Sequence, residues 1–262
     1  MGMPIGVDVC DPEIEASTVD RVYEWLRFVD ATFSTYREHS EISRLNRGEL
    51  ALEQTHYAVR SVLRRGERLR VQTDGYFDMR APLSSTGAAL QSTEAAGVEA
   101  GLRRPIDPSG LVKGWSVAGA ARILDVAGAR NYCVHAGGDV HLRGRSWNNE
   151  HWRVGIQHPR IRDRLATVLI ASDVGIATSG TYERGEHILD PYTGSPSEGV
   201  LSVTIVGPDI ATADAYATAA YAMGPKGAEW CAGLNDYAAI VILADDTVLS
   251  TPAMSRYRAQ AP

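Results

Sequence analysis

The order of the helix and strand patterns along the chain constrains the fold most strongly. Two long stretches near the start carry apolar residues at helical spacing. They are residues 17–31 and a second stretch marked by Val59, Val62, Leu63 and Leu69. Strand-like runs are predicted at Ile5–Val9, Tyr132–Ala136, Trp152–Ile156, Ala166–Ala171, Val200–Val206 and Ala238–Ala244. Because helices and strands do not alternate regularly, the chain is predicted to form a single α+β domain.

The length of the chain limits the number of domains, and its net charge limits the partners that it can bind. The length of 262 residues allows one large domain or two small ones, and only the segment 84–104, rich in Ala, Gly, Ser and Thr, resembles a linker. The formal net charge is −6, and arginines cluster only in short pairs such as Arg64-Arg65. A nucleic-acid partner is therefore not expected.

The sequence also bears on where the protein works. No apolar run is long enough to cross a membrane, and residues 1–10 lack the pattern of a signal peptide. The three cysteines, Cys10, Cys133 and Cys231, are odd in number and no pair has metal-ligand spacing. Nothing indicates a disulfide framework, which favours a reducing compartment. We therefore expect no membrane insertion and a cytoplasmic location, with an exported lipoprotein as the alternative if the N-terminus was truncated.

A polar stretch at 177–194, ATSGTYERGEHILDPYTG, carries the first candidate chemistry. It begins with Thr178-Ser179-Gly180, predicted to be a turn whose small residues let a backbone approach a phosphate. His187 lies three residues before Asp190, and the two side chains would serve as a base and its neighbour. The alternative is a polar loop between two strands.

A helix start is predicted at Asp107-Pro108, with Asp107 as the N-cap and Pro108 in the first position. The N-terminal N–H groups of a helix and its dipole suit an anion. Lys113 adds a positive charge one turn later. The alternative is a capped helix with a solvated lysine.

Two further segments supply oxygen atoms. Gly137-Gly138 follow the strand 132–136 and allow a close approach, so Asp139 would cap this turn or contact a ligand. A helix predicted to open at 212–214 places Asp214 and Thr218 on one face. Carboxylate and hydroxyl oxygens suit Mg²⁺. The alternative is a first-turn carboxylate that acts on the helix dipole and a packed threonine.

Taken in order, these segments resemble the FAD:protein FMN transferases, the ApbE family. The matching segments are Met1-Gly2, Phe33-Ser34-Thr35-Tyr36, Gly75-Tyr76-Phe77-Asp78, Asp107 to Gly114, Ala136-Gly137-Gly138-Asp139, Thr178-Ser179-Gly180, His187 to Pro191 and Asp214 to Thr218. The resemblance runs from Met1 to about Met254. It implies one mixed α/β domain over residues 1–262 with a T-fold-like core.

The resemblance also implies an activity, the Mg²⁺-dependent transfer of the FMN part of FAD to a threonine hydroxyl of an acceptor protein, with release of AMP. Mg²⁺ would be held by the backbone carbonyl of Gly110 and by Asp214 and Thr218, with Asp214 also a catalytic residue. His187 would be the base for the acceptor threonine. The residues implied to contact FAD or line its site are Met1, Tyr36, Tyr76, Phe77, Asp78, Asp107, Lys113, Thr178, Ser179, Gly180 and Leu189.

The chain departs from the family pattern at several places. Ala217 stands where some members carry a second aspartate, and His135 where asparagine is common. The usual tryptophan-glycine-phenylalanine segment is missing from 84–104, and Cys10 lacks the preceding apolar run of a lipid anchor.

Two alternatives use the same site. One is an Mg²⁺-dependent FAD pyrophosphatase that gives FMN and AMP. The other is a non-catalytic FAD-binding protein, against which the presence of both His187 and Asp214 argues.

Overall fold

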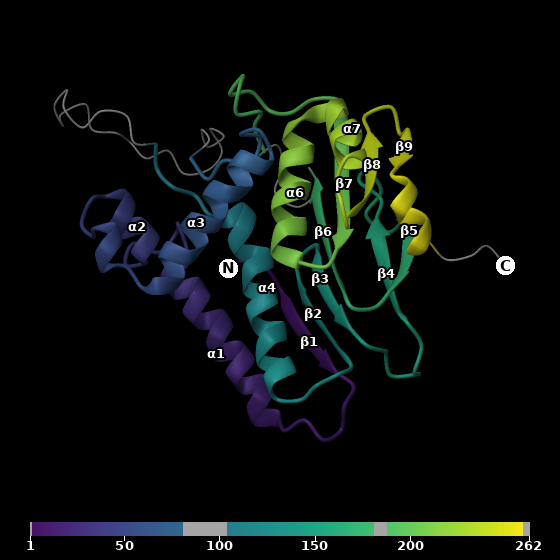
Figure 1. The fold of residues 1–262 in the computed structure, drawn as a ribbon, viewed down its shortest axis with the longest axis horizontal. Helices are drawn as coiled ribbons and strands as arrows, with labels where there is room; N and C mark the ends of the chain where they lie inside the picture. Colours follow the sequence, from purple (N-terminus) through teal and green to yellow (C-terminus); the bar gives the residue numbers. More distant parts are fainter. Residues whose placement is uncertain (1, 81–103, 181–187, 259–262) are drawn as a thin grey trace.

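The computed structural model describes residues 2–80, 104–180 and 188–258. Its centre is a seven-stranded sheet in the order β1-β2-β3-β6-β7-β8-β9, and β4 and β5 form a separate two-stranded ribbon (Figure 1). All neighbouring strands in both sheets pair antiparallel. The strands are β1 Ile5–Val9, β2 Tyr132–Ala136, β3 Asp139–Arg143, β4 Trp152–Gln157, β5 Leu165–Ala171, β6 Val174–Gly180, β7 Val200–Gly207, β8 Ala238–Leu243 and β9 Val248–Ser250.

Helices cover one face of the sheet (Figure 1). The α-helices are α1 Ala16–Phe33, α2 Glu41–Asn46, α3 Tyr57–Gln72, α4 Ser109–Val126, α6 Ile210–Ala222 and α7 Gly227–Ala232. Three short segments form the 3₁₀ helices η1 Leu52–Gln54, η2 Gly224–Lys226 and η3 Pro252–Arg256. α4 and α6 pack against each other and on the sheet, and α1 packs against α4. The β4–β5 ribbon and η3 cover the opposite face. The α+β prediction is confirmed.

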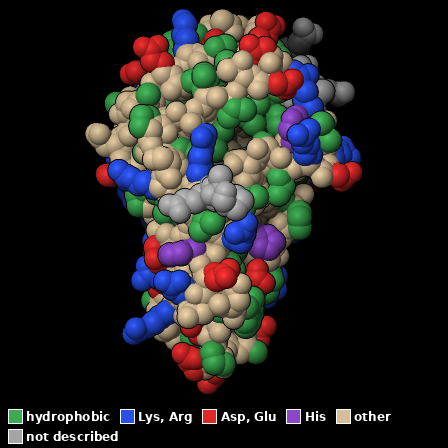
Figure 2. Space-filling view, turned by 90° about the vertical axis from the view of Figure 1, so that its right-hand side faces the viewer, with side chains coloured by type: hydrophobic (Ala, Val, Ile, Leu, Met, Phe, Trp, Pro, Cys, Tyr) green, Lys and Arg blue, Asp and Glu red, His purple; other side chains and the backbone are tan. Residues whose placement is uncertain are grey.

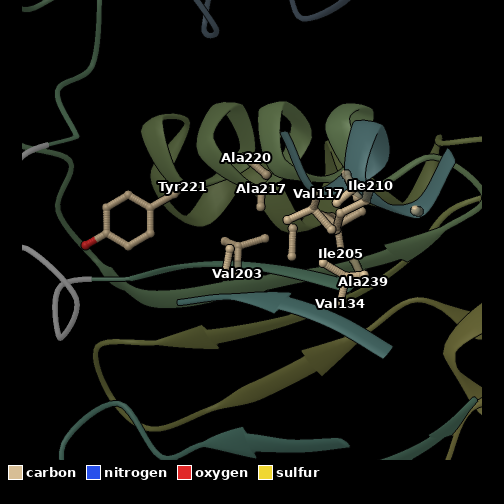
Figure 3. Packing of buried hydrophobic residues seen from close by; sticks show 14 of the residues in the cluster. Val117, Val134, Val203, Ile205, Ile210, Ala217, Ala220, Tyr221 and Ala239 are labelled. Carbon is tan, nitrogen blue, oxygen red and sulfur yellow. The ribbon is translucent and has the colours of Figure 1, made fainter. Parts of the chain in front are cut away.

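Strand β7 contributes to the cores on both faces of the sheet, because alternate side chains point to opposite sides. Val203 and Ile205 pack beneath α6 with Ala217 and Ala220 (Figure 3), whereas Val206 faces the ribbon. The small alanines let α6 lie close to the strands. This closeness extends to Gly175 of β6, where a Cβ would lie 2.6 Å from the Cα of Ile210.

Most predicted elements are confirmed, but three strands, β3, β6 and β9, were not predicted. The prediction of a turn at Thr178-Ser179-Gly180 is wrong, because these residues end β6 and pair with Thr204, Val203 and Ser202 of β7. Local composition favoured a turn, whereas pairing with a distant strand decided the conformation.

Two helix starts also differ from the prediction. α4 begins after Pro108, and Asp107, predicted as the N-cap, accepts a hydrogen bond from the Ser109 amide at 3.0 Å. α6 begins at Ile210, and its N-cap is Asp209, whose side chain accepts from the Thr212 amide at 2.7 Å. Asp214 therefore lies in the second turn, and the alternative of a first-turn carboxylate acting on the helix dipole is wrong.

Three further features concern the length of the helices, the cysteine side chains and the surface charges. Within the described ranges, no helix combines the length and apolar character needed to cross a membrane. Cys133 packs under the ribbon as a small apolar residue, and all three cysteines are free thiols. On the face formed by β5, β9 and η3, acidic and basic side chains are interspersed (Figure 2).

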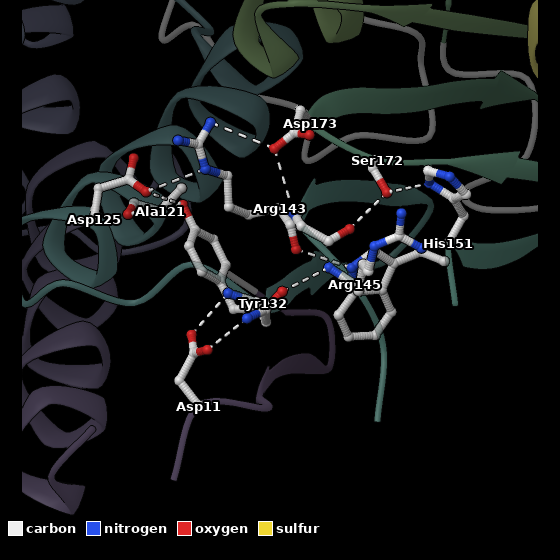
Figure 4. Close-up of polar contacts among 12 residues, drawn as sticks. Asp11, Ala121, Asp125, Tyr132, Arg143, Arg145, His151, Ser172 and Asp173 are labelled. Atoms are coloured by element: carbon white, nitrogen blue, oxygen red, sulfur yellow. Dashed lines mark hydrogen bonds and ion pairs between the residues drawn. The ribbon is translucent and has the colours of Figure 1, made fainter. Parts of the chain in front are cut away.

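Asp11 ties the loop after β1 to the residues that follow α4 (Figure 4). Its Oδ2 accepts hydrogen bonds from the amides of Arg130 and Asn131 at 2.6 and 2.7 Å, and its Oδ1 accepts from the Asn131 side chain at 2.6 Å. We call these three residues the Asp11 network. Burial pushes the pKa of Asp11 up, but the hydrogen bonds outweigh burial and hold the pKa below its usual range.

A second polar group lies beside this network (Figure 4). The Tyr132 hydroxyl donates to Asp125 at 2.8 Å, and Arg143 lies 4.0 Å from Asp125 and 3.4 Å from Asp173. These contacts join β2 and β3 to the C-terminal end of α4. His141 stacks on the Tyr132 ring with centroids 6.1 Å apart, and burial lowers its pKa.

Candidate active site

Three charged side chains meet where α4, β3 and α6 converge. Lys113 Nζ lies 3.0 Å from Asp139 Oδ1 and 3.7 Å from Asp214 Oδ1. The side chain of Asp139 is fully buried, that of Asp214 is 3% exposed and that of Lys113 is 13% exposed. We call these residues the charged triad. Buried ionised groups are stable only when paired and hydrogen-bonded, so the triad is a specific construction of this fold.

Glycine makes the close contact between α4 and α6 possible. A Cβ on Gly114 would lie 2.7 Å from the Ile210 carbonyl oxygen and 2.9 Å from the Asp214 Cβ. With no side chain in the way, the Gly114 amide donates to Asp214 Oδ2 at 2.8 Å. Lys113, the preceding residue, thus lies beside the same carboxylate, and the hairpin turn between β2 and β3 delivers Asp139.

The three predicted metal ligands lie together. Thr218 follows Asp214 by one turn of α6, and a Cβ on Gly110 would lie 3.6 Å from Thr218 Oγ1. Ser179 Oγ at the end of β6 is 3.4 Å from the same oxygen.

The chemistry of this donor set fits Mg²⁺, which prefers hard oxygen ligands and takes few from the protein. No group of three or more His, Cys, Asp or Glu side chains suited to a metal occurs within the described residues. The candidate site instead combines one carboxylate with a hydroxyl and a carbonyl.

A pocket of about 370 Å³ opens beside the start of α4. Its lining includes Met3, Phe33, Tyr36, Asp107 and Lys113. Lys113 belongs to both the pocket and the charged triad, so the two are adjacent. Tyr36 is 82% exposed and lines this pocket. The volume falls within the range of small-molecule sites, roughly 300–1,000 Å³.

Residues 76–78 separate into different environments. Phe77 is buried, and its ring lies 3.3 Å from where a Cβ on Gly110 would be. The Tyr76 ring packs against Tyr192 with centroids 5.0 Å apart, and burial raises the pKa of Tyr76. Asp78 accepts from the Arg80 amide at 2.8 Å and lines a second pocket beneath α3.

The remaining predicted residues are dispersed. The Thr178 hydroxyl bonds to Thr204 within the sheet at 2.9 Å, on the opposite face from Ser179. Gly180 pairs with Ser202, and Leu189 forms an isolated bridge with Pro196. Met1 and His187 lie outside the described residues.

Sequence reasoning missed the pairing of Lys113 with Asp139. The paired glycines at 137–138 indicated a close approach, but they did not identify the partner. It also missed the link between α3 and α6, in which the Arg65 guanidinium pairs with Asp209 and donates to Thr212 at 2.9 Å.

Comparison with known proteins places these features in a family. A model of the ApbE family matches residues 1–86 and 85–241. A FAD:protein FMN transferase of Vibrio cholerae serotype O1 is 29% identical over 291 residues, covering 95% of this chain and 85% of that protein. One from Haemophilus influenzae is 26% identical over 306 residues, covering 98% and 88%.

Solved structures agree with the sequence matches. The flavin transferase ApbE from Vibrio cholerae superimposes with a TM-score of 0.80 at 25% identity, covering 98% of this chain and 96% of that chain. The apo form of the flavinyl transferase ApbE from Pseudomonas stutzeri gives a TM-score of 0.79 at 23% identity, covering 99% and 98%.

Proposed function

The chain belongs to the ApbE family, and we propose that it transfers the FMN part of FAD to a threonine hydroxyl of an acceptor protein in an Mg²⁺-dependent reaction that releases AMP. We further propose that residues 1–262 form one transferase domain. The observation that carries the proposal is the convergence of Gly110, Asp214 and Thr218 next to the pocket lined by Tyr36 and Lys113. Its relatives named FAD:protein FMN transferase align over nearly the whole chain.

The metal would be held by Asp214, Thr218 and the carbonyl of Gly110. Asp214 supplies the charged oxygen, and its second oxygen is oriented by the Gly114 amide at 2.8 Å. Ser179 lies 3.4 Å from Thr218 and borders the same position. When bound, Mg²⁺ would polarise the pyrophosphate and stabilise the negative charge that develops on the departing AMP.

FAD would occupy the pocket beside α4. Tyr36, Asp107 and Lys113 line this pocket, and Phe77 packs under the first turn of α4. The N–H groups of that turn and the Lys113 ammonium suit phosphate oxygens. We propose further contacts from Ser179, Gly180 and the backbone of Thr178 near the phosphates, and from Met1, Tyr76, Asp78 and Leu189 elsewhere in the site.

In the transfer step, the acceptor hydroxyl oxygen attacks the phosphorus of the FMN phosphate. The bond from that phosphorus to the oxygen bridging to AMP breaks, and AMP leaves with the bonding electron pair. The hydroxyl proton passes to His187, because an imidazole exchanges protons readily near neutral pH. Lys113, at the border of the pocket, would hold a phosphate oxygen in place.

Product analysis tests the proposal. The purified protein is incubated with FAD, Mg²⁺ and a threonine-containing acceptor peptide, with and without EDTA. A peptide with valine in place of threonine is the matched control. Fluorescent flavin bound covalently to the threonine peptide, and lost with EDTA, is the expected result. Free FMN and AMP beside a competent acceptor would instead identify a pyrophosphatase, and bound FAD without products would refute turnover.

A further inference from the structure

The charged triad places one ammonium beside two carboxylates from different elements. Lys113 Nζ is 3.0 Å from Asp139 Oδ1 on β3 but 3.7 Å from Asp214 Oδ1 on α6. The first distance is that of a close ion pair, and the second is longer than a direct N–H···O contact. The ammonium therefore contacts Asp139 directly and lies next to Asp214 without the same close contact.

The two carboxylates have less freedom than the lysine ammonium, because a backbone amide binds Asp214 and the short aspartate side chain keeps the Asp139 carboxylate close to β3. Asp214 Oδ2 accepts from the Gly114 amide at 2.8 Å, and Asp139 is the first residue of β3, directly after the hairpin turn. A lysine carries its charge on a flexible four-carbon stem with rotatable donors. Of the three charged groups, the ammonium is thus the one that can change partner.

We propose that Asp139 is a positioning residue that retains the Lys113 ammonium and so prevents it from taking the place of a divalent cation at Asp214. This inference rests on the proposed function, in which Asp214 is a metal ligand. Without the Asp139 carboxylate, the nearest anion to the ammonium within the triad is Asp214 Oδ1, at 3.7 Å. There the ammonium competes with the cation for the same oxygen, so Asp139 sets the metal affinity through Lys113.

The test is a titration with Mn²⁺, a paramagnetic substitute for Mg²⁺, followed by electron paramagnetic resonance. FAD is saturating in every sample, because phosphate oxygens complete the coordination of such ions. The variants are Asp139→Asn, Lys113→Met, the double variant and Asp214→Asn. Asp163→Asn, which changes an exposed carboxylate, is the matched control. Circular dichroism establishes that each variant is folded.

We expect Asp139→Asn to weaken Mn²⁺ binding by about 10–100-fold, the usual effect of removing a group that supports metal ligands. The Mn²⁺ affinity of the double variant should return to within about threefold of that of the unchanged protein, because no ammonium is left to compete with the cation. Lys113→Met alone should bind Mn²⁺ at least as tightly as the unchanged protein.

Two results would overturn the role of Asp139. Unchanged affinity in Asp139→Asn refutes it, and a double variant as weak as Asp139→Asn would make Asp139 a metal ligand instead. If Asp139→Asn does not fold, Lys113→Met decides, because a loss of Mn²⁺ binding in that variant contradicts competition by the ammonium.

Asp214→Asn separates this inference from the proposed function. If that variant keeps the original Mn²⁺ affinity, or if the unchanged protein binds no Mn²⁺ beyond FAD alone, the metal assignment fails. If Asp214→Asn loses binding while Asp139→Asn retains it, only the positioning role is refuted.

Discussion

The Asp11 network and the charged triad lie at opposite ends of α4, and both are built around buried aspartates. Asp11 accepts from two backbone amides and one amide side chain, all at 2.6–2.7 Å. In the triad, Asp139 and Asp214 share a lysine ammonium. Partners in the backbone cannot be exchanged without unfolding, whereas a lysine on a flexible stem can move. The Asp11 network is therefore a structural joint, and the triad is suited to exchange with a ligand.

The largest expected effect comes from the triad. Asp214→Ala should abolish Mg²⁺-stimulated release of AMP from FAD, because it removes the proposed charged ligand of the metal. Some FAD binding should remain, since Tyr36 and Asp107 still line the pocket. Chromatography of AMP and flavin titration measure the two effects, with Asp163→Ala as an exposed control. Unchanged turnover would refute the metal assignment.

The next largest effect concerns His187, the proposed base. His187→Ala should lower turnover by about 10²–10⁴-fold, the usual contribution of a general base. Rates of flavin transfer at saturating FAD, compared with the FAD dissociation constant, distinguish a role of His187 in catalysis from a role in FAD binding. A loss confined to FAD affinity would make His187 a binding residue.

A mutation in the structural joint should act on stability and not on turnover. Asp11→Ala should lower the free energy of unfolding by at least about 2 kcal/mol at pH 7, because it removes three hydrogen bonds to a charged group and such bonds contribute ~1.5–3 kcal/mol each. Urea denaturation measures the loss, and turnover at 25 °C should be retained. Reduced Mg²⁺-dependent activity in a fully folded Asp11→Ala protein would contradict the separation of the two regions.

The contribution of Asp11 should also depend on pH. Because its pKa in the folded protein is lowered, its stabilisation is present above the usual aspartate value of about 3.9 and is lost as the pH falls through the folded value. The stability difference between the original protein and Asp11→Ala should therefore shrink in acid.

The smallest expected effect is at His141, which lies next to the Tyr132 contacts. Its Nδ1 is buried and has no hydrogen-bond partner among the described residues, and burial lowers its pKa although Asp125 opposes this. The folded state resists protonation of His141, so the free energy of unfolding should fall as the pH drops below about 6.5.

His141→Leu should flatten this pH dependence and raise the free energy of unfolding by about 1 kcal/mol at pH 5. Urea denaturation at pH 7 and pH 5 measures this, with the exposed His39→Leu as control. If His141→Leu loses as much stability between pH 7 and pH 5 as the unchanged protein, the pH dependence belongs to other groups.

The sequence by itself determined the elements whose signals are local. Helix α1 and strand β2 follow directly from residue periodicity, and the four-residue spacing of Asp214 and Thr218 places both on one face of α6. The likeness of several short segments to one family also indicated the proposed metal ligands and the proposed FAD-binding residues, but not how they lie in space.

Only the tertiary structure decided the contacts that join distant segments. Thr178-Ser179-Gly180 form a strand because β7 pairs with them, with Thr178 and Thr204 separated by 26 positions. Lys113 and Asp139 meet because Gly114 lets α4 approach α6 while a hairpin turns β3 beneath them. The sequence around Lys113 does not indicate Asp139, nor the reverse. A buried ion pair depends on where the backbone places each charged group, and not on the neighbours of that group in the sequence.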